Sequence, residues 1–281
     1  MKFRGKMTDA GAVRQLTNLA STLAKMKAAS VTLRLSKDLS TFSMCEEAGS
    51  GVICWCALEQ GQLFTELTLE GATAEHNQIC MHLSPALVAS ALTSSKNALG
   101  VANSVKLKLT NKKSPCLTFQ IDLPSIGLNP RTCIHDVPIT LIPRSEWPLH
   151  EHPEVPIPNI SIRVSSVKKV RTVIDRLRKL SSKLHIRASS NGDLCLRTET
   201  DAGTFATFFQ HMPVIQSEDT NDGNVQTVSL WIDAKKIAQL LASDQLNTEY
   251  LTLGLIDDRM LHVILTQNDM HLHYLIAAIS L

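Results

Sequence analysis

The sequence predicts an α+β protein built from two similar domains, and three observations lead to this fold class. The chain has 281 residues, which is enough for two domains of ordinary size, each with its own core. A proline-rich stretch divides it near the middle, and the order of strands and helices before this stretch recurs after it. Apolar residues make up 44% of the chain and charged residues 19%, as is typical of globular proteins.

The dividing stretch is PRSEWPLHEHPEVPIPN, residues 143–159, which contains five prolines. Proline has no backbone N–H and fixes φ, so we expect neither a helix nor a sheet interior here. The predicted organisation is therefore an N-terminal domain over residues 1–142, an interdomain linker over 143–159 and a C-terminal domain over 160–281.

Each predicted domain begins with a short alternating strand, at residues 2–7 and 160–164, followed by a long amphipathic helix. Asp9 and Ser166 are the expected N-caps of these two helices. A shorter helix follows in each half, and we expect the four helices at 10–27, 85–98, 167–183 and 234–243. Strands fill the space between the helices, and three strands close each half; the last of these are 132–142 and 269–278.

Pro138 lies inside the strand TCIHDVPITLI and cannot donate a hydrogen bond to a neighbouring strand. We therefore expect this strand to lie at a sheet edge, or to carry a bulge. Another chain could add a strand to the edge, or the linker could fold over it.

Basic side chains concentrate on the predicted helices, which together contain thirteen Lys or Arg and one acid, Asp175. Most acidic residues lie on predicted strands and loops, so the helical layer is expected to be positive and the sheets negative. A solvated lysine face is the alternative for any single helix. The excess of cations on all four predicted helices instead favours a surface that contacts the phosphates of a polyanion without reading bases. The cations that project away from the apolar stripes are Arg14, Lys25, Lys96, Lys168, Arg176, Lys179, Lys183 and Lys235.

Motifs for catalysis or for metal and nucleotide binding are not found. The sequence contains no G-x-x-x-x-G-K-[ST], G-x-G-x-x-G or G-x-S-x-G. His150, Glu151 and His152 lie in the linker, and His262, His271 and His273 are interpreted as exposed strand histidines. We expect no enzyme activity, no cofactor and no metal. Seven cysteines without a paired CxxC spacing favour a reducing compartment, and no apolar run is long enough to span a membrane.

Several segments resemble the Hus subunits of the nine-one-one (Rad–Hus–Rad) DNA-damage checkpoint clamp, within the sliding-clamp superfamily. They are MKFRGKM, WCALEQG, LEGATAEHNQI, LKLTNKKSPCLT and above all HDVPITLIPRSEW, all in the first half. The second half is similar more loosely, through IRVSSVKKVRTVIDRLRKLSSKL, GDLCLRTET and DAKKIAQLLASDQLN, while the loop QHMPVIQSEDTNDGN departs from the family pattern.

This resemblance implies two similar sliding-clamp (PCNA-like) domains, with helices on the concave face and antiparallel sheets outside. It further implies a non-catalytic subunit of a heterotrimeric ring with two Rad-type sister subunits, placed on double-stranded DNA at damage sites by a clamp loader. Such a ring supports checkpoint kinase signalling and recruits repair enzymes, in the nucleus with some cytoplasmic protein.

By the same resemblance, the eight cations named above would line the bore. The subunit edges would be the strands 132–142 and 203–211, with Ile134, Asp136, Pro138, Thr140, Phe205, Thr207 and Phe209. The linker would border a groove for partners, with Pro143, Arg144, Trp147 and Pro153. A second functional hypothesis is a scaffold protein whose basic helices dock acidic protein partners without DNA. A third, an enzyme with an unrecognised site, has no sequence motif to support it.

Overall fold

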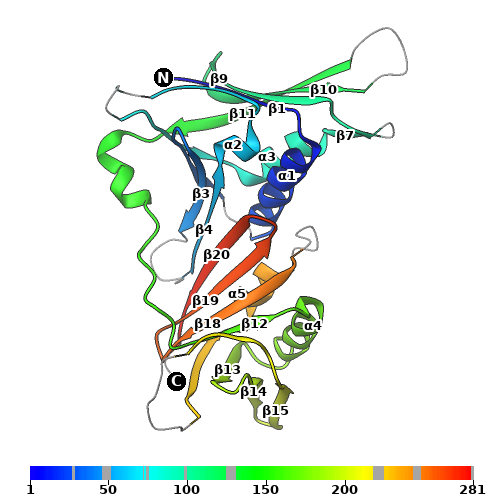
Figure 1. Cartoon of the computed structure of the whole chain (residues 1–281), viewed down its shortest axis with the longest axis vertical. Helices are drawn as coiled ribbons and strands as arrows, with labels where there is room; N and C mark the ends of the chain where they lie inside the picture. The colour runs from blue at the N-terminus through cyan, green and yellow to red at the C-terminus, as the bar shows by residue number, and fades with distance from the viewer. Residues whose placement is uncertain are drawn as a thin grey trace. The chain divides into compact units, whose positions relative to one another are not determined.

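The computed structural model describes residues 1–26, 29–45, 52–71, 73, 76–97, 100–124, 131–217, 225–242 and 248–279 (Figure 1). The chain forms two compact units. The N-terminal unit contains Met1–Met44 and Cys56–Glu151, and the C-terminal unit contains Cys45–Trp55 and His152–Leu281.

The N-terminal unit is built on one antiparallel sheet, in which the strand order is β4-β3-β2-β6-β11-β10-β9-β1-β5. Its strands are β1 (Lys2–Met7), β2 (Val31–Leu35), β3 (Leu39–Cys45), β4 (Val52–Glu59), β5 (Glu66–Glu70), β6 (Ile79–Leu83), β9 (Ser104–Asn111), β10 (Pro115–Leu123) and β11 (Arg131–Leu141). Of β4, residues 56–59 belong to this unit, and residues 52–55, with Trp55, belong to the C-terminal unit. A separate two-stranded ribbon pairs β7 (Lys96–Asn97) with β8 (Gly100–Val101).

Helices of this unit are α1 (Ala10–Lys25), the single turn α2 (Gln60–Leu63) and α3 (Pro85–Thr93). α1 and α3 lie side by side beneath β1, β9 and β10 (Figure 1). The apolar stripe of α1 is buried at Val13, Leu16, Ala20 and Leu23, as the periodicity predicts. The predicted cap of α1 is confirmed, since the Asp9 carboxylate accepts a hydrogen bond from the Ala12 N–H at 2.7 Å.

The C-terminal unit contains two antiparallel sheets, with strand orders β16-β12-β18-β19-β20 and β15-β14-β13-β17. Its strands are β12 (Ile160–Val164), β13 (Lys183–Ser189), β14 (Leu194–Thr200), β15 (Gly203–Phe209), β16 (Val214–Ser217), β17 (Thr227–Asp233), β18 (Tyr250–Ile256), β19 (Met260–Gln267) and β20 (Met270–Ala277). Helices α4 (Val167–Leu177) and α5 (Ala234–Leu241) contact each other. α4 buries Val170, Ile174 and Leu177, so the predicted stripe is correct up to that residue.

The second part of the linker lies on the C-terminal unit. A Cβ atom added to Gly254 in β18 would come within 2.8 Å of the Pro158 ring, so glycine at this position lets the linker approach the strand closely. The Asn159 side chain then accepts a hydrogen bond from the Asp257 N–H at 2.9 Å.

The first part of the linker contradicts the prediction that neither helix nor sheet forms there. Arg144–His150 forms a 3₁₀ helix, η1. Trp147 anchors this turn, because its side chain is 9% exposed and its indole N–H donates to the Ile142 carbonyl at 3.0 Å. Pro143 precedes the helix and Pro148 lies within it, so both rings are tolerated in a short turn that needs few backbone donors.

Two predicted helices are shorter than expected. α3 ends at Thr93 and α4 at Leu177, so Lys96 lies in β7 and Lys183 begins β13. In α4 the apolar spacing continues to Leu180, which is 47% exposed and already outside the helix. Five strands were not predicted: β6, the two-residue strands β7 and β8, β16 and β17.

From Arg131 to Pro138, β11 pairs with β10, and Cys116 is the partner of Pro138. From Ile139 to Leu141 the strand pairs instead with β6, on its other side, and His82 is the partner of Thr140. Among the described pairings, each residue of β11 therefore has a neighbouring strand on one side alone, as expected for the predicted edge.

Candidate nucleic-acid and subunit interfaces

The exposed faces of the helices carry cations in both units. On α1, Arg14 and Lys25 are exposed and lie eleven residues apart, which places them within about 20° of each other around the helix axis. On α4 and α5, Lys168, Arg176 and Lys235 are exposed. Each unit therefore presents lysine or arginine on the helix surface that faces away from its own core.

The acid of α4 does not neutralise this surface. The Asp175 carboxylate lies 2.8 Å from Arg178 Nε and 3.7 Å from Arg171 Nε. Within the part of the chain that the structure describes, no ion pair joins a carboxylate to Lys168 or Arg176. These two cations remain available to an anion outside the chain.

Three of the predicted phosphate-binding cations do not lie on helices. Lys179 is exposed in the turn that follows α4. Lys183 is exposed at the start of β13, where its backbone is opposite Asp233 in the ladder with β17. Lys96 lies in β7, and its side chain is outside the described residues.

The predicted partition between positive helices and negative sheets is wrong for the N-terminal unit. β1 and β9 carry five cations, Lys2, Arg4, Lys6, Lys106 and Lys108, on the face of the sheet opposite to α1. In the sequence these cations are the alternating residues of MKFRGKM and VKLKL, and alternate residues of a strand share one face of a sheet.

The part of β11 that pairs with β10, residues 131–138, presents an exposed apolar residue among polar neighbours. Ile134 is 61% exposed. Asp136 accepts hydrogen bonds from Lys112 and Thr118, both at 2.6 Å, and the bond from Lys112 is the main reason that the pKa of this carboxyl is lowered. Pro138 is exposed.

β15 is the edge strand of the second sheet in the C-terminal unit, since β14 is its neighbour and no further strand follows it in the described order. Phe205 is 43% exposed and, with Thr207, borders a cavity of about 410 Å³ between β15 and α4. Val173, Arg176, Leu177 and Leu180 line the helical side of this cavity. Phe209 is half-buried near the other end of the strand.

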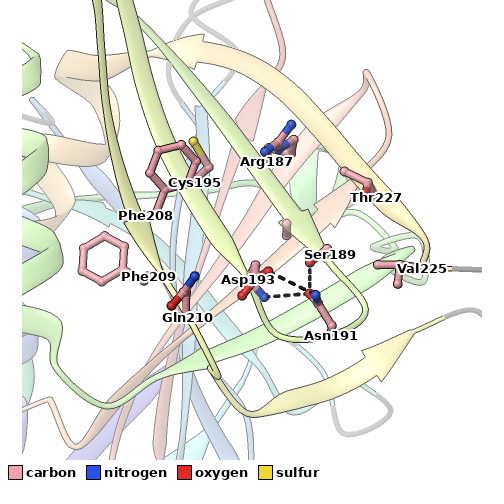
Figure 2. A pocket seen from close by; sticks show the side chains of 11 residues that line it. Arg187, Ser189, Asn191, Asp193, Cys195, Phe208, Phe209, Gln210, Val225 and Thr227 are labelled. Carbon is pink, nitrogen blue, oxygen red and sulfur yellow. Dashed lines mark hydrogen bonds between the residues drawn. The ribbon is translucent and has the colours of Figure 1, made fainter.

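A second cavity, of about 260 Å³, lies at the turn between β13 and β14 (Figure 2). The side chains of Ser189, Asn191 and Asp193 hydrogen-bond to one another at its wall. Cys195 also lines it, and burial raises the pKa of this thiol. These three side chains are therefore engaged with one another, while Arg187, Gln210 and Thr227 also line the cavity.

The linker exposes side chains other than those predicted. Pro143 and Arg144 are exposed, and Arg144 contacts the His76 ring, but Trp147 is buried and faces its own unit. Pro153 is half-buried. The large exposed apolar residues of the linker are Leu149 at 80% and Ile157 at 73%, which the sequence reasoning did not select.

Of the three histidines that the sequence suggested as exposed in the last hairpin, His271 is exposed, whereas His262 and His273 are not. His262 is 8% exposed, and its Nε2 lies 3.1 Å from His273 Nδ1. Both rings stack with Trp55, at centroid distances of 6.1 and 4.8 Å, and His152 of the linker stacks on the same indole at 5.3 Å. Burial lowers the pKa of His262 and of His273 to about 4, so both are neutral at physiological pH.

Among the described residues, no group of three His, Cys, Asp or Glu side chains is arranged to hold a metal ion. No helix in this part of the chain is long and apolar enough to cross a membrane. The site that the residues build is therefore a set of surfaces, formed by cationic helices, two strand edges and a linker.

Comparison with known proteins identifies the family. A family model described as "Hus1-like protein" matches residues 1–280. The chain belongs to the Hus1-like family. This Hus1-like chain is 36% identical to checkpoint protein HUS1 of Homo sapiens over 285 residues, with 100% of both chains covered. It is 27% identical to a checkpoint protein Hus1-like of Drosophila melanogaster, again over 100% of both chains.

Solved structures place the fold of the Hus1-like chain among the sliding clamps. The crystal structure of proliferating cellular nuclear antigen from Entamoeba histolytica matches with a TM-score of 0.72 at 12% identity, covering 99% of both chains. The predicted α+β sliding-clamp fold is confirmed, and so is the resemblance to Hus subunits. The Hus1-like chain is thus a checkpoint-family protein with the architecture of a clamp subunit.

Proposed function

We propose that this Hus1-like chain is a non-catalytic subunit of a heterotrimeric ring that encircles double-stranded DNA at damage sites. Two Rad-type sister subunits complete the ring, and a clamp loader places it on DNA. In the nucleus, with some protein in the cytoplasm, the ring supports checkpoint kinase signalling and recruits repair enzymes.

One observation carries the DNA-facing part of the proposal: the helices of both units present exposed cations for which no carboxylate partner is found among the described residues. Arg14 and Lys25 on α1 and Lys168 and Arg176 on α4 contact phosphates without reading bases. Weak interactions of this kind suit a ring, since closure around the duplex rather than affinity prevents its dissociation. Lys179, Lys183 and Lys235 extend the same surface, and Lys96 is retained as a candidate.

The strand edges support the ring-forming part of the proposal. Among the described strands, β11 over residues 131–138 and β15 each have an unpaired side, and they belong to different units. An edge of one subunit that pairs with a different edge of the next gives a head-to-tail contact, which is the type of interface that builds rings. The proposed edge residues are Ile134, Asp136, Pro138 and Thr140 in β11 and Phe205, Thr207 and Phe209 in β15.

Repair enzymes are proposed to dock along the linker. Leu149 and Ile157 present exposed apolar side chains there, next to Pro143, Arg144 and Pro153. Trp147 contributes by holding the linker on the N-terminal unit rather than by contacting the partner.

The test of the DNA-facing assignment replaces Lys168, Arg176 and Lys179 with alanine in the assembled ring. DNA affinity is expected to fall, and the dependence of log affinity on log salt to become shallower by about 0.9 for each phosphate that the ring no longer neutralises. Duplex binding is measured by fluorescence anisotropy over a range of salt concentrations, together with retention on closed circular DNA.

The matched control replaces Lys2, Lys6 and Lys112 with alanine, which removes the same charge from cations already paired with Glu70, Glu66 and Asp136. This control is expected to keep the salt dependence of the unaltered ring. If both triple variants bind DNA as the unaltered ring does, and the ring is not retained on circular DNA, the chain is instead a scaffold for acidic proteins.

A further inference from the structure

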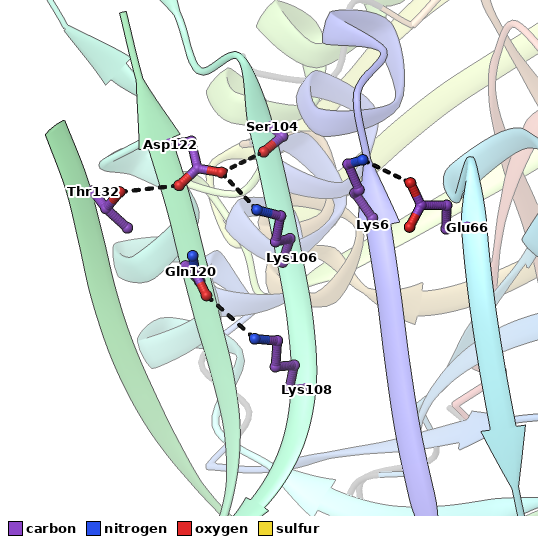
Figure 3. A network of polar contacts seen from close by, with 8 residues as sticks. All are labelled: Lys6, Glu66, Ser104, Lys106, Lys108, Gln120, Asp122 and Thr132. Carbon is purple, nitrogen blue, oxygen red and sulfur yellow. Dashed lines mark hydrogen bonds and ion pairs between the residues drawn. The ribbon is translucent and has the colours of Figure 1, made fainter. Parts of the chain in front are cut away.

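The sheet of the N-terminal unit has a polar face on the side opposite to α1. Phe3 and Met7 of β1 point to the core, so the residues that alternate with them, Lys2, Arg4 and Lys6, occupy the other face. Figure 3 shows Lys6 in the same face as Lys106 and Lys108 of the neighbouring strand β9. Five cations are therefore gathered on two adjacent strands.

Three of these five cations are neutralised by acids on the flanking strands. Lys2 lies 3.1 Å from Glu70 and Lys6 lies 2.6 Å from Glu66, both in β5. On the other side, Lys106 lies 3.0 Å from Asp122 in β10, and Asp122 also accepts from Ser104 and Thr132 (Figure 3).

Arg4 and Lys108 are the exceptions within the described part of the chain. They are direct partners across the β1–β9 ladder, where two like charges repel each other. On the other side of each strand their ladder partners are neutral: Thr68 on β5 is opposite Arg4, and Thr118 on β10 is opposite Lys108. The pKa of the Glu66 carboxyl is lowered mainly by its hydrogen bond from Lys6. The charge of Arg4 contributes to the same shift at longer range.

The groups around this pair offer hydrogen-bond donors. The Lys108 ammonium lies 3.3 Å from the Gln120 side-chain oxygen, so the amide nitrogen of Gln120 is left as a donor. The Arg4 guanidinium is exposed and provides a planar set of N–H groups, which matches the oxygens of a phosphate. Two positive charges and three donor groups suit one dianionic group with several acceptor oxygens.

We propose that Arg4 and Lys108, with Gln120, bind the phosphate of a phosphorylated serine or threonine in a segment of a partner protein. The charges nearby favour this occupant over nucleic acid. Glu66 on β5 is the ladder partner of Lys6, and Asp136 on β11 is the ladder partner of Thr118, so carboxylates lie on both outer sides of the pair. A duplex with a charge at about every 1.7 Å would meet them, whereas one phosphate group fits between them. The site lies on β1, β9 and β10, where Gln120 is the ladder partner of Ile134 in β11, and it does not depend on DNA encirclement.

The experiment measures capture of the purified full chain on immobilised peptide libraries of the form Ala-X₃-phosphothreonine-X₃-Ala, where X is any residue. Otherwise identical libraries carry threonine or glutamate at the central position. Capture is expected on the phosphothreonine library, and added inorganic phosphate is expected to compete. The double variant Arg4→Gln with Lys108→Gln is expected to bind at least about tenfold more weakly, because two charge-assisted hydrogen bonds to the phosphate are removed.

The matched control is Lys2→Gln with Lys112→Gln, which removes two cations of the same sheet face that already have acid partners. It is expected to keep the capture of the unaltered chain, and circular dichroism melting checks that both variants fold. Equal capture by the three libraries, equal capture by the two variants, or no capture at all would overturn the proposal. Loss of duplex DNA binding in the Arg4/Lys108 variant, with phosphopeptide capture unchanged, would assign the pair to nucleic acid instead. The salt-dependence test of the helices is unaffected by any of these results.

Discussion

At the scale of single residues, the Trp55 stack is the clearest case of side chains whose chemistry depends on burial. His262 on β19 and His273 on β20 lie diagonally opposite on one face of the hairpin; Trp55 stacks with both rings, and His152 stacks on Trp55. In the sequence, the two histidines look like ordinary polar positions of a hairpin. The indole that buries them comes from a strand about two hundred residues earlier, so spacing within the hairpin could not reveal their environment.

Burial of these neutral imidazoles makes the stability of the protein dependent on pH. The pKa of His262 in the folded state, about 4, is below the unfolded value of about 6.5, so the unfolded state binds more protons between these values. Stability is therefore full above about pH 6.5 and decreases as the pH falls towards 4, by at most about 1.4 kcal/mol per pH unit for each imidazole.

His262→Gln keeps a polar group near the position of Nε2 but cannot titrate, so its free energy of unfolding is expected to vary less steeply over this range. Urea denaturation between pH 7 and pH 5 measures the difference. His271→Asn is the control, because His271 is exposed and bonds to Thr266 through Nδ1. Equal slopes for the His262 variant and the unaltered chain would show that this burial does not set the pH dependence.

At the scale of elements, the ends of helices were harder to predict than their existence. The stripe of α4 was correct at Val170, Ile174 and Leu177, yet Leu180 continues the same spacing beyond the end of the helix. What ends α4 is tertiary: β13 begins at Lys183 and pairs with β17, a strand that is distant in the sequence. The apolar periodicity of the segment cannot predict a pairing with a distant strand.

Missed strands have two different causes. β6, ICMHL, lies between β2 and β11 and is buried on both faces, so it lacks the alternation that marks a half-buried strand. β17, TVSLWID, does alternate, with Val228, Leu230 and Ile232 buried, and could have been found. For the candidate interfaces, the sequence identified the cationic helices and the β11 edge, but not the burial of Trp147 or the cation pair on β1 and β9.

The N-cap of α1 gives a prediction at this scale. Asp9→Ala removes the acceptor for the Ala12 N–H and is expected to lower the free energy of unfolding by about 1 kcal/mol. Ser84→Ala is the matched control, because Ser84 occupies the N-cap of α3 without a side-chain hydrogen bond to the helix. Its effect should be only a few tenths of a kcal/mol, as measured by urea denaturation. Equal losses in the two variants would mean that the Asp9 bond does not stabilise α1.

At the scale of the whole molecule, the strand edges differ in a way that suggests which of them associate. β5 is an edge strand in the N-terminal unit and exposes Glu66 and Glu70, as edges protected from pairing commonly do. In contrast, the open part of β11 exposes Ile134, and β15 exposes Phe205 and Phe208. Apolar side chains on an unpaired edge are costly to leave in water, which supports β11 and β15 as the proposed subunit contacts.

Ile134→Lys tests that assignment without disturbing the core. Ile134 is 61% exposed, so the folded chain should lose no more than about 0.5 kcal/mol of stability, whereas association with the sister subunit should weaken because a charge would be buried at the interface. Leu149→Lys is the control, since it makes the same change at a residue that is 80% exposed on the linker. Co-purification and sedimentation with the sister subunits measure both variants. If Ile134→Lys assembles as well as Leu149→Lys does, β11 is not a subunit edge, and the open side of this strand must be covered in another way.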